Sequence, residues 1–145
     1  MGKVLEIGIS SNKGEQIQNV NSVEVVKGKG LLNDRKFREN NKKECQITLI
    51  EIENINHFNN ISKTSIAPLD FRRNIITENI KLNDLLGKEF LVGEVKLRAH
   101  DLCKPCLYLE NKLKLNNFIK EFLHTGGLRC EILTNGKIIV GDSIK

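Results

Sequence analysis

The residues best suited to chemistry are two cysteines three positions apart, in the segment Cys103-Lys104-Pro105-Cys106. Such a pair can be a redox dithiol, half of a tetrahedral zinc site, or the source of a single reactive thiolate. A thioredoxin-like dithiol needs a later cis-proline loop, but no proline follows Pro105. Zinc needs two further ligands, whereas Cys45 and Cys130 are isolated and are expected to be small buried hydrophobes. We therefore favour a single thiolate that acts as a nucleophile or a metal ligand.

Basic neighbours would favour the ionised form of this thiol. Lys104 is adjacent in the sequence, and Arg98, His100 and the Arg72-Arg73 pair are candidate neighbours in space. Positive charge lowers the pKa of a thiol and raises the thiolate fraction. A soft thiolate suits molybdenum or a sulfane sulfur. His100 is the histidine nearest to the cysteines in the sequence, and the three histidines show no mutual metal-ligand spacing.

A second candidate is the segment Phe71-Arg72-Arg73-Asn74-Ile75. We expect a strand over residues 71–77, which would place Arg72 and Asn74 on one face and Arg73 on the other. A forked cation beside an amide suits a phosphate and the edge of a heterocycle. The same spacing is also typical of a solvated strand face.

The third candidate is a glycine-broken loop, Gly28-Lys29-Gly30, which runs on to Asp34-Arg35. Glycine lets the backbone approach a ligand closely, and Arg35 could bind an anion. An ion pair after such a loop is also common in ordinary turns, so this pattern alone does not predict a site.

The elements that must position these residues are mostly strands. Alternating or continuous apolar residues predict strands, and helical spacing predicts short helices at 51–58 and 117–124. Gly93-Glu94 and Asn135-Gly136 each lie between two apolar runs and predict hairpin turns. Many short strands with few helices favour a closed or nearly closed β-barrel, a mainly β fold. The expected strands are residues 4–10, 23–26, 46–50, 71–77, 89–92, 95–100, 128–134 and 137–140.

Composition is consistent with one domain over residues 1–145, with an aliphatic core, because Trp is absent and aromatic residues make up only 5%. The net charge of +5 favours an anionic ligand, but a solvated surface is the simpler explanation of it. No signal peptide and no apolar run of membrane-spanning length is present. We expect a cytoplasmic protein that contacts neither membrane nor nucleic acid.

Taken in order, the segments resemble the MOSC family, named after the C-terminal domain of molybdenum cofactor sulfurases. The resemblance runs over almost the whole chain. One departure is Asn33, where the family usually has glycine before Asp34-Arg35. The matching segments are Gly2–Ser10, Gly28–Arg35, Gln46–Glu51, Phe71–Ile75, Leu82–Gly87, Val92–Val95, Leu102–Glu110, Gly126–Arg129 and Ile138–Asp142.

The resemblance implies a β-barrel similar to the barrel domain of pyruvate kinase, in a small stand-alone member of the family. It also implies that the second cysteine of the loop, Cys106, is the critical one. In relatives that reduce N-hydroxylated compounds, the matching cysteine is the protein ligand of molybdenum. Arg72 and Asn74 match residues that contact the pterin of the cofactor there.

We therefore expect a module that binds the molybdenum cofactor or carries its sulfur. Cys106 would bind metal or hold a persulfide, and Cys103 would be an auxiliary thiol. The cofactor would not be required for folding. Expected partners are a cofactor-biosynthesis or sulfur-donor protein, or a molybdoenzyme. The expected cofactor-binding residues are Arg72, Asn74, Arg73, Arg35, Asp34 and His100.

Two alternatives stay open, and the sequence does not decide whether the protein is an enzyme. One is a small molybdenum-dependent reductase of N-hydroxylated compounds. The other is a non-catalytic interaction domain in which Cys103 and Cys106 form a structural or zinc knuckle.

Overall fold

A computed structural model describes residues 2–12, 15–103 and 126–145. Within them the chain forms a closed, mixed barrel of seven strands, with one α-helix and three short 3-10 turns. The ring runs in the order β11-β7-β8-β9-β5-β6-β1, and β11 pairs again with β1 to close it. The strands of the ring are β1 (Gly2–Ile9), β5 (Ile47–Glu51), β6 (Ile75–Glu78), β7 (Glu89–Val92), β8 (Val95–Leu102), β9 (Leu128–Ile132) and β11 (Ser143–Ile144).

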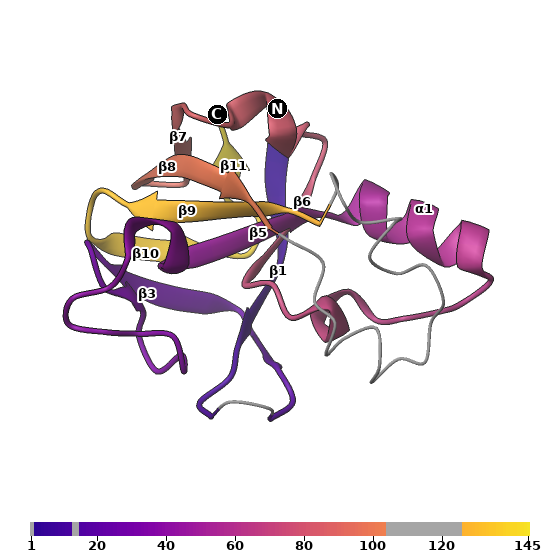
Figure 1. The fold of residues 1–145 in the computed structure, drawn as a ribbon, viewed down its shortest axis with the longest axis horizontal. Helices are drawn as coiled ribbons and strands as arrows, with labels where there is room; N and C mark the ends of the chain where they lie inside the picture. The colour runs from indigo at the N-terminus through magenta and orange to yellow at the C-terminus, as the bar shows by residue number, and fades with distance from the viewer. Residues whose placement is uncertain (1, 13–14, 104–125) are drawn as a thin grey trace.

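Four further strands flank the barrel. Strand β2 (Gln18–Val20) extends the sheet beyond β1, and β3 (Ser22–Val26) lies between β10 (Gly136–Ile139) and β4 (Gly30–Leu31) in a three-stranded sheet. Only the β5–β6 pair of the barrel is parallel. Helix α1 (Ile52–Ser62) supplies the crossover between those two strands and projects away from the barrel (Figure 1). A helix is expected here, because two parallel neighbouring strands cannot be joined by a tight turn and need a long connection.

The barrel interior is aliphatic, as the composition predicts. Strand β8 illustrates why: Val95, Leu97 and Ala99 are buried inside, while Lys96 and Arg98 alternate with them on the outer face. This period of two is what a pleated strand requires when only one face is apolar. The inner face of β8 is therefore apolar, and its charged side chains lie outside the barrel.

A second, smaller apolar cluster lies under α1. Ile55 and Phe58 are the buried residues of the helix, and Phe58 packs edge-on against Phe71 with ring centroids 6.0 Å apart. Phe71 ends the 3-10 turn Pro68–Phe71, so this contact fixes the chain just before Arg72 and Arg73. The helix thus positions two candidate residues without itself reaching the barrel interior.

The hairpin expected at Gly93-Glu94 is confirmed, because β7 and β8 pair directly across it. The hairpin expected at Asn135-Gly136 is wrong. Strand β10 pairs with β3, with Gly136 opposite Val25, while β9 pairs with β5 and β8. Asn135 instead accepts a hydrogen bond at its side-chain oxygen from the amide of Lys27, at 2.7 Å, and so links two distant segments.

The strand expected over residues 71–77 is also wrong in its first half, because β6 begins only at Ile75. Pro68 starts a 3-10 turn, and Arg72 closes it in the left-handed conformation (φ 64) with its amide donating to Leu69 O at 3.0 Å. The alternation that would have set Arg72 and Asn74 on one face therefore does not apply. The helix expected at 117–124 lies outside the described residues.

Candidate functional site

Cys103 follows the last residue of β8 and is buried, with 4% of its surface exposed. Its amide donates to Gly127 O at 2.7 Å, which fixes it beside the start of β9. Burial raises the pKa of the Cys103 thiol, and the nearby charges of Arg73, Arg129 and Lys36 only partly oppose that rise. Cys103 is therefore a neutral thiol at physiological pH, surrounded by positive charge.

Arg73 is positioned by the same glycine pair as Cys103. Its Nε donates to Gly126 O at 2.9 Å, and its Nη1 donates more weakly to Phe71 O at 3.5 Å. Both acceptors are neutral carbonyls, so the positive charge of the guanidinium is directed but not cancelled. Arg73 thus lies close enough to Cys103 to act on its thiol, as expected.

Arg72 points to a different part of the surface. Its Nη1 donates to Glu15 O at 2.9 Å. Its Nη2 is buried and has no hydrogen-bond partner among the described residues. Since a buried unpaired donor is costly, this nitrogen requires an acceptor beyond the described residues or on a ligand.

Asn74 joins three strands. Its Oδ1 accepts from the amide of Thr48 at 3.1 Å and from the Thr48 hydroxyl at 3.2 Å, while its Nδ2 donates to Gly8 O at 3.1 Å. Its own amide donates to the Thr48 hydroxyl at 3.0 Å. The side-chain amide of Asn74 thereby makes the hydrogen bonds to neighbouring strands that backbone groups would make within a sheet, just before β6 begins. At most one Nδ2 hydrogen remains for a ligand, so Asn74 is first of all a structural residue.

The loop that ends in Asp34 and Arg35 reaches the same end of the barrel. The buried Asp34 carboxylate accepts the amide of Ser10 at 2.9 Å and that of Lys36 at 3.3 Å, and the Arg35 amide donates to Ser10 O at 2.6 Å. Asn33 adopts a left-handed conformation (φ 70), which glycine adopts freely and asparagine tolerates. This explains why asparagine can stand where the family usually has glycine.

Lys36 extends the site and was not predicted from the sequence. Although the residue as a whole is exposed, its pKa is lowered, first by burial of its amine and then by the charges of Arg35 and Arg73. Cys103 and Asp34 act on it in the opposite direction. Asp34, Arg35, Arg73 and Cys103 thus lie close enough to Lys36 to act on the charge of its amine. The sequence feature that could have identified Lys36 is its position directly after the Asp34-Arg35 pair.

Arg129, on β9, is the second residue that the sequence did not single out. Its Nε donates to Glu44 O at 3.0 Å, and its Nη2 donates to Cys45 Sγ at 3.0 Å. Cys45 is therefore a half-buried thiol that accepts a hydrogen bond, rather than the buried hydrophobe expected. Cys130, by contrast, is fully buried in the core as expected.

His100 lies on the outer face of β8, where its Nε2 is 2.7 Å from Glu131 Oε1. It is thus tied to a carboxylate rather than gathered with Lys36, Arg73 and Cys103. Cys106, the predicted critical residue, lies outside the described residues, as does Lys104. Within the described part of the chain, no three His, Cys, Asp or Glu side chains are grouped as a metal site would require.

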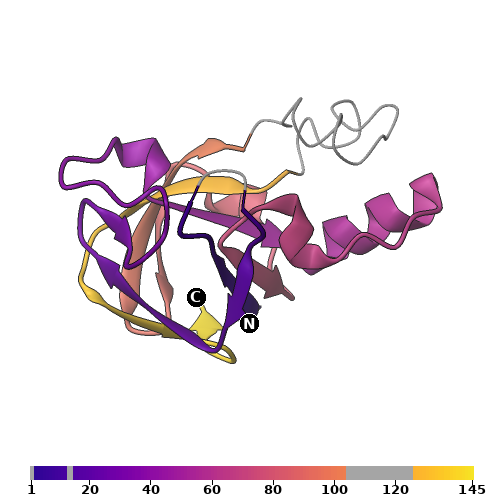
Figure 2. The same cartoon turned by 90° about the horizontal axis from the view of Figure 1, so that it is seen from below.

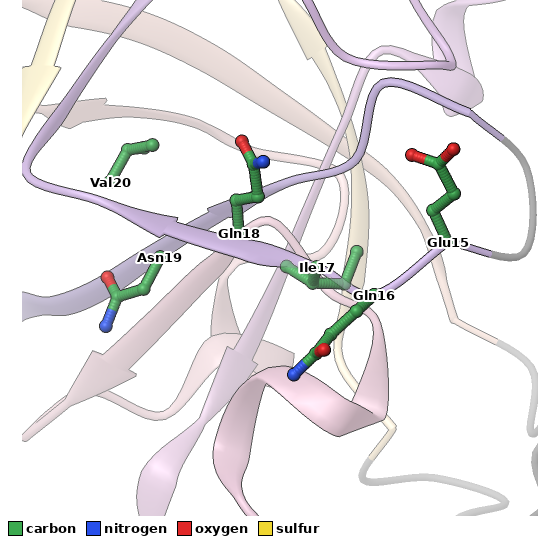
Figure 3. A pocket seen from close by; sticks show the side chains of 6 residues that line it. All are labelled: Glu15, Gln16, Ile17, Gln18, Asn19 and Val20. Atoms are coloured by element: carbon green, nitrogen blue, oxygen red, sulfur yellow. The ribbon is translucent and has the colours of Figure 1, made fainter.

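A surface depression of 710 Å³ follows residues 15–20 at the outer edge of the sheet. Figure 3 shows Gln18 and Val20 on one side of this segment and Asn19 on the other. The depression is shallow and is lined by polar and apolar side chains without a titratable cluster. One of its lining residues, Glu15, also holds Arg72 through its carbonyl oxygen.

In the described residues, no helix is both long enough and apolar enough to span a membrane. This result leaves the expected cellular location as a prediction from the sequence.

The family model described as "MOSC domain" matches residues 22–145. The fold is similar to that of the YuaD protein from Bacillus subtilis, with a TM-score of 0.83 at 17% identity, covering 99% of this chain and 94% of that one. YiiM from Geobacillus stearothermophilus (TM-score 0.79, 18% identity, 99% and 74% covered) and YiiM from Escherichia coli (0.72, 15%, 99% and 68%) are also similar. A search of curated proteins finds no match.

Proposed function

Because the chain belongs to the MOSC domain family, we propose that it binds the molybdenum cofactor, or carries a sulfur atom destined for it, beside Cys103 and Cys106. The observation that carries the proposal is the positive charge gathered around the Cys103 thiol by Lys36, Arg73 and Arg129. An anionic ligand with a sulfur-seeking centre matches that combination of charge and thiol.

The residues present fit the cofactor by their chemistry. Its phosphate would find guanidinium and ammonium donors at Arg73, Arg35 and Lys36. Arg72, which the resemblance assigns to the pterin, has a buried Nη2 without an acceptor among the described residues and could donate to another part of the cofactor. When bound, the cofactor would supply a molybdenum centre capable of oxidation and reduction.

Within this proposal the two cysteines have different roles. Burial keeps Cys103 protonated, so it is suited to line the site and not to attack a substrate. Cys106 is only three residues further along, and three extended residues span at most about 11 Å. We therefore assign the metal-ligating or sulfur-carrying role to Cys106, as the resemblance implies.

As a sulfur carrier, Cys106 would act by thiol exchange. Its thiolate would attack the terminal sulfur of a donor persulfide, form a new S–S bond, and release the donor as a thiolate. The transfer involves no net oxidation. The positive charges of Arg73 and Lys36 would stabilise the anionic persulfide that results.

Native mass spectrometry of anaerobically purified protein, incubated with released molybdenum cofactor, tests the proposal. We expect a mass gain equal to the cofactor, or to one sulfur atom after incubation with a persulfide donor. Cys106→Ser should abolish the gain, whereas Cys103→Ser should retain most of it. Cys45→Ser is a matched control, since Cys45 accepts its hydrogen bond from Arg129 and is not assigned to the ligand.

Loading that survives in a folded Cys106→Ser protein would contradict the assignment of Cys106. A wild-type protein that gains neither cofactor nor sulfur would contradict the proposed function itself. Circular dichroism of each variant establishes that the barrel is intact.

A further inference from the structure

The positive charge of this protein is concentrated in residues 27–45, which we call the basic segment. It contains seven of the 23 Lys and Arg residues but only three of the 18 Asp and Glu residues. The basic segment therefore carries a formal charge of +4, and the rest of the chain supplies only +1 of the total of +5. Its cations are Lys27, Lys29, Arg35, Lys36, Arg38, Lys42 and Lys43. A surface of such charge is suited to a partner of opposite charge.

The basic segment is folded back on itself by hydrogen bonds to its own backbone. The side-chain nitrogen of Asn41 donates to Lys29 O and to Lys36 O, both at 2.8 Å. The amide of Asn41 donates to Gly28 O at 3.4 Å, and the amide of Arg38 donates to Lys29 O at 3.2 Å. These bonds join the second half of the segment to the first, so its cations are held together on one part of the molecule.

The basic segment lies at the side of the barrel opposite helix α1, as Figures 1 and 2 both show. It connects β3 to β5, and its last residues form the 3-10 turn Lys43–Cys45. Arg129 of β9 is held against this turn, because its Nε donates to Glu44 O and its Nη2 donates to Cys45 Sγ. The neighbouring strand therefore adds a further positive charge to this side of the barrel.

Nearby carboxylates compensate only a small part of this charge. Within the basic segment, Asp34 is buried and accepts two backbone amides, and Glu39 pairs with Lys29 at 2.6 Å. On the adjoining sheet, Glu24 of β3 lies directly opposite Lys137 of β10, so that pair of residues adds no net charge. Most of the positive charge of the basic segment is thus left for a partner to balance.

The cations best placed to meet a partner are exposed to solvent. Arg38 is oriented by neutral acceptors, because its Nη1 donates to Arg35 O at 2.7 Å and to Phe37 O at 2.8 Å. The other N–H groups of its guanidinium keep their capacity to donate to a carboxylate. Three exposed lysines of the segment form no salt bridge within the described residues, namely Lys27, Lys42 and Lys43.

The composition of this surface favours a protein partner over nucleic acid. Leu32 is 39% exposed within the basic segment, and protein interfaces combine such apolar contacts with charged ones. Among the described residues, none of the exposed large apolar side chains is aromatic, whereas single-stranded nucleic acid is bound by stacking its bases on aromatic rings. The exposed cations lie in loops and a short 3-10 turn, not on a helix that could enter the major groove of a duplex.

We propose that the basic segment is a docking surface for an acidic protein, which contacts it through a cluster of carboxylates. The contacting cations are Lys27, Arg38, Lys42 and Lys43. Exposed ion pairs each add little affinity, but together they accelerate encounter and select partners of opposite charge. The complex is therefore transient and weakens as salt screens the charges. The inference goes beyond the proposed function, because it does not depend on what Cys106 carries.

Fluorescence anisotropy of a labelled peptide of alternating Glu and Ser residues tests the surface in the full chain at low ionic strength. We expect saturable binding that weakens as salt is added. Replacing both Lys42 and Lys43 with Gln should weaken binding by about fivefold or more, because two ion pairs are lost. Replacing both with Arg should keep the affinity within about twofold of the wild type, because the charges remain.

The matched control replaces Lys81 and Lys88 with Gln. These two lysines are exposed and lie outside the basic segment, so the control removes the same net charge from another part of the surface. Equal weakening by the control and by the double Gln variant of Lys42 and Lys43 would overturn the proposal, because net charge alone would then explain binding. A wild-type protein that does not bind the peptide at low ionic strength would overturn it as well.

A DNA duplex of the same total charge as the peptide tests the choice of partner. Suppose that the duplex binds more tightly than the peptide, and that the Lys42 and Lys43 variant weakens duplex binding while the control does not. The surface would then be assigned to nucleic acid, and the commitment to a protein would be overturned. Circular dichroism of each variant establishes that the fold is intact.

Cys106→Ser separates this inference from the proposed function. Peptide affinity should be unchanged in that variant, and a loss would place the peptide at the cysteines and overturn the docking surface. Failed cofactor or sulfur loading, with peptide binding that still depends on Lys42 and Lys43, contradicts the proposed function alone. Intact loading with failed peptide binding contradicts the docking surface alone.

Discussion

Replacing Gly127 with alanine should destabilise the barrel more than any other glycine replacement of similar backbone geometry. A Cβ at this position would lie 2.0 Å from Leu49 O and 3.1 Å from Leu49 C, and the φ of +110° is one that L side chains rarely adopt. Both neighbouring atoms are backbone of β5, so no side chain can rotate away. The start of β9 must move to admit the methyl group.

The magnitude follows from three contributions. The unfavourable backbone conformation costs about 1–3 kcal/mol. Overpacking against an immovable backbone costs about 1–3 kcal/mol. Weakening the bond from the Cys103 amide to Gly127 O costs about 1 kcal/mol. We therefore expect a loss of roughly 3–7 kcal/mol, a large part of the about 5–15 kcal/mol available to a domain.

Gly141→Ala is the matched control. Gly141 has a φ of +96°, but a Cβ there would meet nothing within 4 Å. Gly141→Ala should lower the free energy of unfolding only by the cost of the unfavourable backbone conformation, about 1–3 kcal/mol. Urea unfolding followed by circular dichroism gives both values. If Gly127→Ala is no less stable than Gly141→Ala, the reasoning about the contact with Leu49 is refuted.

Two more predictions concern buried polar groups. Asn74→Ala should lower the free energy of unfolding by about 2–4 kcal/mol, because it leaves Thr48 and the Gly8 carbonyl without their partners. A stable Asn74→Ala protein that has lost cofactor binding would instead make Asn74 a ligand residue. Burial raises the pKa of Glu51 above its usual 4.5 in the folded state. Its stabilising contribution is thus complete below that pH and is lost as the pH rises through the folded-state pKa. Urea unfolding should therefore show Glu51→Gln gaining stability relative to the wild type as the pH increases from about 4 to 7, and a constant difference would contradict this.

The fold class was predictable because it depends on patterns that every strand repeats. Alternation in residues such as Val95, Leu97 and Ala99 sets the inner face of the barrel wherever the strand is placed. Which strands pair with one another is harder to predict from the sequence, as Asn135-Gly136 shows. A favourable turn sequence cannot outweigh long-range pairing when the following strand fits better beside β3.

The candidate site was predictable in part. The Asp34-Arg35 loop, Arg73 and Cys103 do come together, although they are far apart in the sequence. Lys36 and Arg129 escaped notice because a single basic residue carries no pattern of its own. What distinguishes them is that their charges act on the Cys103 thiol, and only the folded chain reveals that.

The pairing that closes the barrel lies between the two ends of the described chain. Gly2 is opposite Ile144, and both termini appear side by side in Figures 1 and 2. During synthesis, β1 therefore emerges long before β11. The part of β1 that pairs with β11 stays unpaired until β11 has been made. Closure across such a sequence separation is slow compared with local hairpin formation. Waiting edges of this kind can also pair with a neighbouring chain. We expect the nascent protein to be most prone to aggregation just before β11 leaves the ribosome.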